Sequence, residues 1–223
     1  MTLSDFIARA YIVATGEVST LTTSDDDYEK LRQLANINID DWSSEPGVSW
    51  RSLYSIENIG AVTATDTFDF DTDTIREISN QEGDNVRLVH ADGTNYTDYA
   101  LVAPERLKDF STGPYCAVIG ATIVFNRAFV STDPQFGGAI NVPCFLFPDL
   151  LVNSTDTVPV DIAEWLVYAT AAEFDRTDLT RQNLYPGLVA KANDLMIAMK
   201  QANSPQITPL HKDQVSYPNG STW

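Results

Sequence analysis

The sequence predicts an α+β protein in which a helical bundle from both ends of the chain surrounds an inserted antiparallel β-sandwich or barrel, followed by an extended C-terminal tail. Apolar residues recur at helical spacing near both ends of the chain, and short strand-like runs separated by turn signals fill its middle. The last stretch contains three prolines and no periodicity. The expected ranges are residues 1–53 for the first helices, 54–155 for the β domain, 156–202 for the closing helices, packed on the first ones, and 203–223 for the tail.

Two helices are expected before residue 53. Ser4 is the predicted cap of the first helix, and Gly16 its predicted end. Ser24 is the predicted cap of the second helix, which places three carboxylates in the first turn, where the helix dipole favours negative charge. These are Asp25, Asp26 and Asp27. The predicted apolar faces are Ile7, Ala10, Tyr11 and Ala14 in the first helix, and Tyr28, Leu31, Leu34, Ala35, Asn38 and Trp42 in the second.

Strands are expected from about residue 50 to residue 152. Sequences such as Ala91-Asp92-Gly93-Thr94 are turn signals between short runs rich in β-branched and aromatic residues. The predicted strands are residues 61–70, 74–79, 85–90, 96–102, 115–125 and 139–147. This length and spacing are typical of a small antiparallel sandwich or barrel.

Helical spacing returns after Pro159. Asp161 and Glu164 resemble the start of a capping box, and Pro186 is expected in the first turn of the last helix. The predicted faces are Ile162, Trp165, Leu166, Ala169 and Ala172, and then Leu188, Ala192, Leu195, Met196 and Met199. Such stripes are typical of helices that pack on a core.

One carboxylate cluster lies within the β region, at Asp69, Asp71 and Asp73. In an extended strand these residues share one face, opposite Phe68 and Phe70. We interpret the cluster as a solvated strand face that leads into a turn. A cation site and a pair of catalytic carboxylates remain alternatives, although a calcium loop of this spacing would need Gly and Glu at positions 74 and 80, which Thr and Asn occupy.

Composition narrows the classes of function. The chain has 31 acidic and 14 basic residues and a formal net charge of −17, which opposes binding to nucleic-acid phosphates and to anionic lipid. No signal peptide and no membrane-spanning run is recognised, so we expect a protein made in the cytoplasm, without a membrane partner. Cys116 and Cys144 are predicted to be small buried thiols.

The residues that most enzymes need are scarce. The chain has two histidines, His90 at the end of a predicted strand and His211 in the tail. Phosphate-binding, nucleophile-elbow and zinc-protease motifs are not found. We therefore expect a protein that is not an enzyme, with no catalytic residues, no metal and no cofactor.

The layout resembles the head-to-tail adaptor (connector or neck) proteins of tailed bacteriophages. The similarity lies in residues 34–38, 42, 50–54, 84–88, 99–104, 165–173, 185–186 and 192–196. It is a similarity of layout and loose pattern over most of residues 1–202, without a single diagnostic motif. The long β segment departs from the shorter, mainly helical adaptors. The resemblance therefore does not specify which layer of the neck this protein would occupy.

The resemblance implies a structural virion protein that forms a ring, usually of twelve copies, under the portal protein and joins it to a tail or nozzle protein. It also implies a C-terminal tail that docks on the portal, with Pro205, Pro209, Tyr217 and Trp223 as the candidate contact residues. Genomic DNA would pass through the ring without specific binding, because acidic walls repel phosphate. The channel-facing candidates are Asp25, Asp26, Asp27, Asp69, Asp71 and Asp73.

Two other classes of function remain open. The β segment is also compatible with a module that binds a glycan or a peptide through Tyr96, Tyr99 or Tyr115, although each of these is an equally good core residue. An acidic hydrolase would use Asp69, Asp71 or Asp73, and replacing all three by Asn should abolish its activity.

Overall fold

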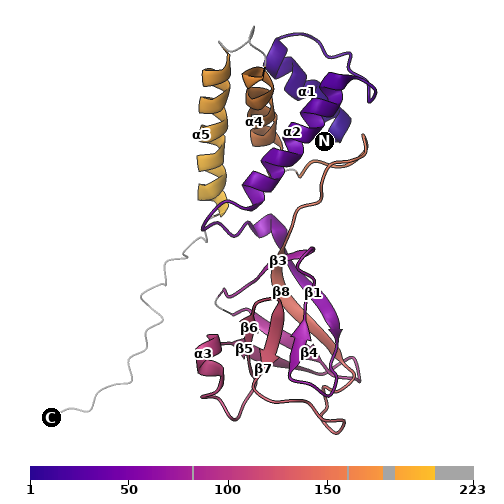
Figure 1. Cartoon of the computed structure of the whole chain (residues 1–223), viewed down its shortest axis with the longest axis vertical. Coiled ribbons are helices and arrows are strands. Elements are labelled where there is room, and N and C mark those ends of the chain that lie inside the picture. The colour runs from indigo at the N-terminus through magenta and orange to yellow at the C-terminus, as the bar shows by residue number, and fades with distance from the viewer. Residues whose placement is uncertain (82, 160, 178–183, 204–223) are drawn as a thin grey trace, which may run out of the picture.

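The computed structural model describes residues 1–81, 83–159, 161–177 and 184–203. Its fold is α+β, as predicted: helices from both ends of the chain pack together, and a curled, mostly antiparallel half-barrel is inserted between them. Figure 1 shows the helices at one end of an elongated molecule and the sheet at the other. The predicted tail, from residue 204 onward, lies outside the described residues.

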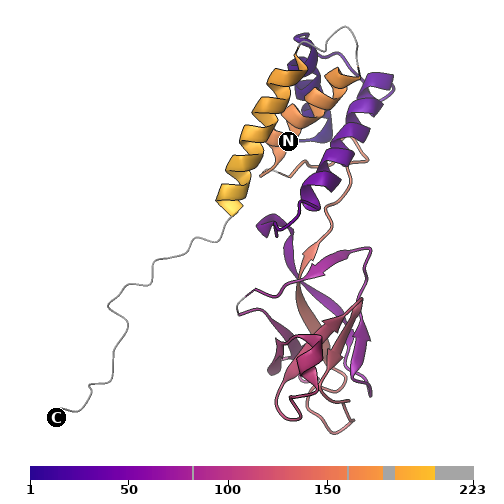
Figure 2. The same ribbon diagram turned by 60° about the vertical axis from the view of Figure 1, so that its left-hand side comes forward.

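The bundle is formed by α1 (Leu3–Thr15), α2 (Asp26–Ser43), α4 (Ala163–Arg176) and α5 (Tyr185–Asn203). Helix α4 lies in the middle and contacts the other three. The predicted apolar stripes supply the core, in which Phe6, Leu31 and Leu166 are fully buried. Both views place α5 on one side of α4 and α2 on the other (Figures 1 and 2).

Three of the predicted helix starts are wrong in detail. Thr2, not Ser4, caps α1, because its hydroxyl accepts the N–H of Asp5 at 3.2 Å. Asp25 itself, not Ser24, is the N-cap of α2, and its carboxylate accepts the N–H of Thr22 at 2.6 Å instead of a helix amide. Asp161 does not cap α4, which begins after Ile162 without a side-chain cap. The predicted end of α1 is confirmed, since Gly16 adopts φ 73° and donates its N–H to Ile12.

The half-barrel is one eight-stranded sheet. Its strands are β1 (Tyr54–Ala61), β2 (Thr67–Asp69), β3 (Ile75–Ile78), β4 (Asn85–Val89), β5 (Tyr96–Leu101), β6 (Tyr115–Ile119), β7 (Thr122–Phe125) and β8 (Ala139–Leu146). Their order is β1-β8-β4-β5-β6-β7-β2, with β3 also paired to β8. Only the pairing of β5 with β6 is parallel among the described strands. Two short helical turns, η1 (Arg51–Leu53) and α3 (Pro104–Leu107), flank it.

Two predicted strands differ from the structure. The strand expected at residues 61–70 is a loop that ends in the short β2, whereas β1 precedes it and was not predicted. The strand expected at residues 115–125 is a hairpin, because Gly120 takes φ 61° and turns the chain between β6 and β7. The other four predicted strands are confirmed to within a residue or two at their ends.

The concave side of the sheet has its own apolar core. Phe68, Tyr99, Phe125 and Phe129 form an edge-to-face aromatic cluster, with Tyr99 and Phe125 centroids 4.9 Å apart. Cys116 and Cys144 are free and fully buried in this core, as predicted, and burial raises the thiol pKa values to about 12 and about 11, respectively. The sheet therefore has a packed interior separate from the helical core.

Candidate interaction surfaces

The C-terminal end of α5 is fixed to the junction between the helices and the sheet. The side chain of Asn203 accepts the N–H of Arg51 at 2.9 Å and donates to the carbonyl of Ser49, also at 2.9 Å. One turn earlier, Lys200 forms an ion pair with Glu45. Asn203, the last of the described residues, therefore has a fixed position beside η1.

A second anchor fixes the connector that leads from β8 back to the helices. Asn36 in α2 bonds the backbone of Leu151 twice, accepting its N–H at 2.8 Å and donating to its carbonyl at 3.0 Å. Arg32 donates to the same carbonyl at 3.0 Å. Leu151 is thereby buried in the helical core, and its neighbours Leu150 and Val152 are turned to solvent.

An exposed apolar surface results beside α2. Leu150 and Val152 are 59% and 63% exposed, and Ile37, the residue after Asn36, is 57% exposed. We call these three residues the α2 flank. Leu150 and Val152 also line a groove of about 900 Å³ between this connector and residues 52–55, along which Tyr54 and Phe147 are exposed.

The opposite side of the bundle is formed by α5. Of its nineteen residues, only Ala192 is buried, because one face of α5 packs on α4 and its C-terminal end contacts the loop after α2. Ala190, Ile197 and Ala198 point away from the bundle, and Ile197 is 54% exposed. We call these three residues the α5 flank. A helix with so little burial is typical of one that completes its packing against another molecule.

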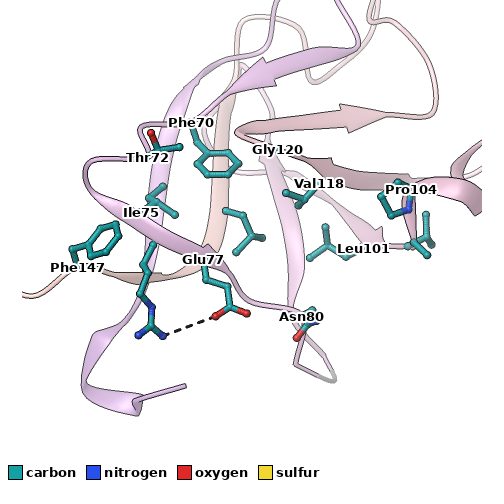
Figure 3. A pocket seen from close by; sticks show the side chains of 14 residues that line it. Phe70, Thr72, Ile75, Glu77, Asn80, Leu101, Pro104, Val118, Gly120 and Phe147 are labelled. Atoms are coloured by element: carbon teal, nitrogen blue, oxygen red, sulfur yellow. Dashed lines mark ion pairs between the residues drawn. The ribbon is translucent and has the colours of Figure 1, made fainter. Parts of the chain in front are cut away.

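The open seam of the half-barrel contains a further groove, of about 670 Å³. Figure 3 shows Phe70, Ile75, Val118 and Leu101 around it, and an ion pair between Arg76 and Glu77 at its rim. Most of the lining side chains are apolar, and Thr72, Arg76, Glu77 and Asn80 supply polar groups, a combination that ligand sites often have.

The acidic residues predicted to face a channel are surface residues with local bonds. Asp26 and Asp27 are exposed in the first turn of α2, at the end of the bundle away from the sheet (Figure 1). The hydrogen bonds from Thr22 hold the pKa of Asp25 below its usual value. This is a turn-forming role, and the structure brings no ligand-binding group to these carboxylates among the described residues.

The second acidic cluster does not lie along one continuous strand. Strand β2 ends at Asp69, which accepts the hydroxyl of Thr122 at 2.6 Å, and a turn follows. In that turn Asp71 accepts the N–H of Asp73 at 2.9 Å and the hydroxyl of Thr74 at 2.7 Å, and these bonds lower its pKa. The interpretation as a solvated strand end that leads into a turn fits this geometry. The prediction that all three residues share one face of an extended strand is wrong, because only Asp69 lies in a strand.

The remaining candidate residues divide between the core, the surface and the tail. Tyr99 is buried in the aromatic cluster, and Tyr115 stacks on Phe110 at 4.2 Å, whereas Tyr96 is exposed. His90 bonds Thr97 through Nε2 at 2.9 Å. His211 and the tail candidates Pro205, Pro209, Tyr217 and Trp223 lie outside the described residues.

Within the described ranges, no group of three or more His, Cys, Asp and Glu residues is placed to bind a metal ion. None of the described helices is long and apolar enough to cross a membrane.

No protein-family model matches this chain. A search of curated proteins likewise finds no similar sequence. The candidate surfaces therefore rest on the geometry of the chain itself.

The two flanks and the two anchors were not predicted from the sequence. Asn36 and Asn203 look like ordinary polar helix residues, because their partners lie 115 and 154 positions away in the chain. One signal for the α2 flank was present in the sequence: Ile37 is an apolar residue that lies outside the predicted apolar face of its helix.

Proposed function

We propose that this protein is a ring-forming head-to-tail adaptor of a tailed bacteriophage, a structural virion protein that docks under the portal protein and joins it to a tail or nozzle protein. The observation that carries the proposal is the division of the molecule: helices from both ends of the chain form one bundle, the half-barrel extends beyond it, and the last helix ends at Asn203, which is bonded to the junction between them.

That arrangement suits a protein that links two partners. A bundle and a half-barrel with separate cores offer distinct surfaces at opposite ends of an elongated molecule. A C-terminal segment starting from an anchored residue can reach a third surface, because twenty extended residues span up to about 66–72 Å. In the proposed ring, Pro205, Pro209, Tyr217 and Trp223 contact the portal.

The charge is compatible with passage of DNA. With −17 per copy, a ring of twelve would carry a formal charge on the order of −200, and this remains effective at the ~8 Å Debye length of physiological salt. Asp26 and Asp27, or Asp69, Asp71 and Asp73, are the exposed carboxylates proposed to face the channel. Repulsion of phosphate would let DNA pass without being retained.

Light scattering of the purified full chain, with and without purified portal rings, tests this function. We expect either rings of the chain alone or a monomer that assembles only on the portal. Replacing Tyr217 and Trp223 by Ala should weaken portal binding at least about tenfold, as loss of aromatic anchors commonly does. Tyr96→Ala, which removes an exposed aromatic residue of the sheet, is the matched control and should bind normally. A stable monomer without portal affinity would contradict the proposal.

One observation favours a second candidate, a glycan-binding β module. Tyr96 is 56% exposed under the guanidinium of Arg87, which lies 4.0 Å from the ring centroid and pairs with Asp98 at 2.7 Å. Arg87 and Asp98 also line a hollow of about 250 Å³ with Asn85 and Asn141. A glycan-array screen of the wild-type chain and Tyr96→Ala tests it: binding that needs Tyr96 supports this candidate, and an empty array rejects it.

A further inference from the structure

We propose that neighbouring copies in the ring meet through two different surfaces, the α5 flank of one copy (Ala190, Ile197 and Ala198) packing on the α2 flank of the next (Ile37, Leu150 and Val152). This inference rests on the proposed adaptor function. It names the surface by which that function would be assembled, and the occupant of each flank is a second copy of this chain.

The first argument is the position of the two flanks. A closed ring needs a heterologous contact, in which two different patches on opposite sides of each subunit meet. Helices α2 and α5 lie on opposite sides of α4 in both views (Figures 1 and 2). If the ring axis runs parallel to the long axis of each molecule, rotation about it brings the α5 flank of one copy next to the α2 flank of the next copy.

The second argument is that the two flanks lie at the same distance from the junction between the helices and the sheet. Helices α2 and α5 both end at the junction, since Asn203 bonds the loop that follows α2. Ile37 lies six residues before the end of α2 at Ser43, and Ile197 lies six residues before the end of α5 at Asn203. At about 1.5 Å per residue, each isoleucine lies about 9 Å from the junction. When two copies stand side by side with their junctions aligned, Ile37 of one copy and Ile197 of the other therefore lie at the same position along the ring axis.

The third argument is complementarity of charge and shape. Helix α5 carries two lysines and one aspartate, whereas α2 carries five acidic and two basic residues. Lys200 pairs with Glu45 of its own chain, so the exposed Lys191 is the cation of α5 that would face an acidic neighbour. Ala190 and Ala198 leave room for the larger Leu150 and Val152 side chains, and the Asn36 and Arg32 bonds to Leu151 hold those side chains outward.

The first test changes one residue on each side. In the full chain, Ile197→Glu and, separately, Ile37→Glu should raise the concentration at which half of the protein is assembled by at least about tenfold. Val130→Glu, at a residue that is 52% exposed in the loop between β7 and β8, is the matched control and should assemble as wild type. Circular dichroism checks that each variant is folded. Normal assembly of both flank variants would overturn the inference.

The second test uses cysteine cross-linking, because both native cysteines are buried and do not compete. Full chains with Ile37→Cys alone and with Ile197→Cys alone are assembled as a mixture, on portal rings where the chain needs them, and oxidised. We expect covalent dimers from the mixture and none from either variant alone. Dimers from Ile197→Cys alone would show a symmetric contact, and rings without cross-links would place the interface elsewhere; both overturn the inference but not the adaptor proposal. Absence of any assembly, with or without portal, overturns both.

Discussion

At the scale of single residues, Gly138 lets the start of β8 lie close to the end of β4. It lies just before β8, and a Cβ atom built on it would lie 1.8 Å from the carbonyl oxygen of Val89 at the end of β4. On its other side, its carbonyl accepts the N–H of Val62 at 2.8 Å. Three backbone segments therefore approach one another at a position that only glycine fits.

Replacing Gly138 by Ala should lower the free energy of unfolding by about 3 kcal/mol, because the obstacle is backbone that cannot rotate away. Urea denaturation monitored by circular dichroism measures this. Gly187→Ala in α5 is the matched control: its Cβ meets open space, so stability should be unchanged or slightly higher. Equal stability of the two variants would contradict the close approach.

Glu29 is the residue whose titration should be visible in stability. Hydrogen bonds from Arg32 at 2.6 and 2.8 Å, and one from Gln33 at 2.8 Å, lower its pKa from 4.5 to about 2. A carboxylate with a lowered pKa in the folded state stabilises that state above the unfolded pKa, and this contribution is lost as the pH falls from about 4.5 to about 2. Glu29→Gln should therefore lower the urea midpoint at pH 7 and have a smaller effect at pH 2.5. An equal loss at both pH values would exclude this ionic contribution.

At the scale of elements, helices were predicted better than strands for a physical reason. The apolar faces of α1, α2 and α4 are buried as their spacing predicts, since each helix meets one core. Strand β1 escaped prediction because its pattern is inverted: Tyr54 and Ile56 face solvent, while Ser55 and Glu57 are half-buried and bonded to each other at 2.6 Å. Periodicity reveals a strand only when its apolar residues face the core.

Functional surfaces were predictable only where they depend on local sequence. The turn at Asp71 and the tail composition can be read from neighbouring residues, whereas the α2 flank exists because Asn36 fixes a connector more than a hundred positions away. No pattern among neighbouring residues in the sequence predicts a contact between positions so far apart in the chain.

The connector anchor gives an element-scale prediction. Asn36→Ala removes both of its bonds to Leu151 and leaves a buried N–H without its partner, which should cost about 1–3 kcal/mol. Hydrogen exchange should show faster exchange at residues 150–152 and little change in the sheet. Asn193→Ala, an exposed amide on α5, is the control and should leave exchange unchanged. Equal protection of the connector in both variants would mean that Arg32 alone suffices.

At the scale of the whole molecule, assembly of this chain must overcome its own charge. Copies that each carry −17 repel one another over the Debye length, which is about 30 Å at 0.01 M salt and about 8 Å at 0.15 M. Raising salt from about 0.01 to 0.15 M should therefore lower the concentration needed for half-assembly, the opposite of an association that depends mainly on attraction between charges.

A pair of equal charge changes separates this general repulsion from the proposed contact. Lys191→Glu on α5 and Lys108→Glu beside α3 alter the net charge by the same amount, and both side chains are exposed. General repulsion weakens assembly equally in the two variants. If α5 meets the acidic α2 of a neighbour, Lys191→Glu should weaken assembly several-fold more than Lys108→Glu at about 0.05 M salt, and the gap should narrow at about 0.5 M as screening shortens the range of the charges. Half-assembly concentrations from light scattering at both salt levels measure the gap, and equal behaviour of the two variants throughout would remove the charge argument for this interface.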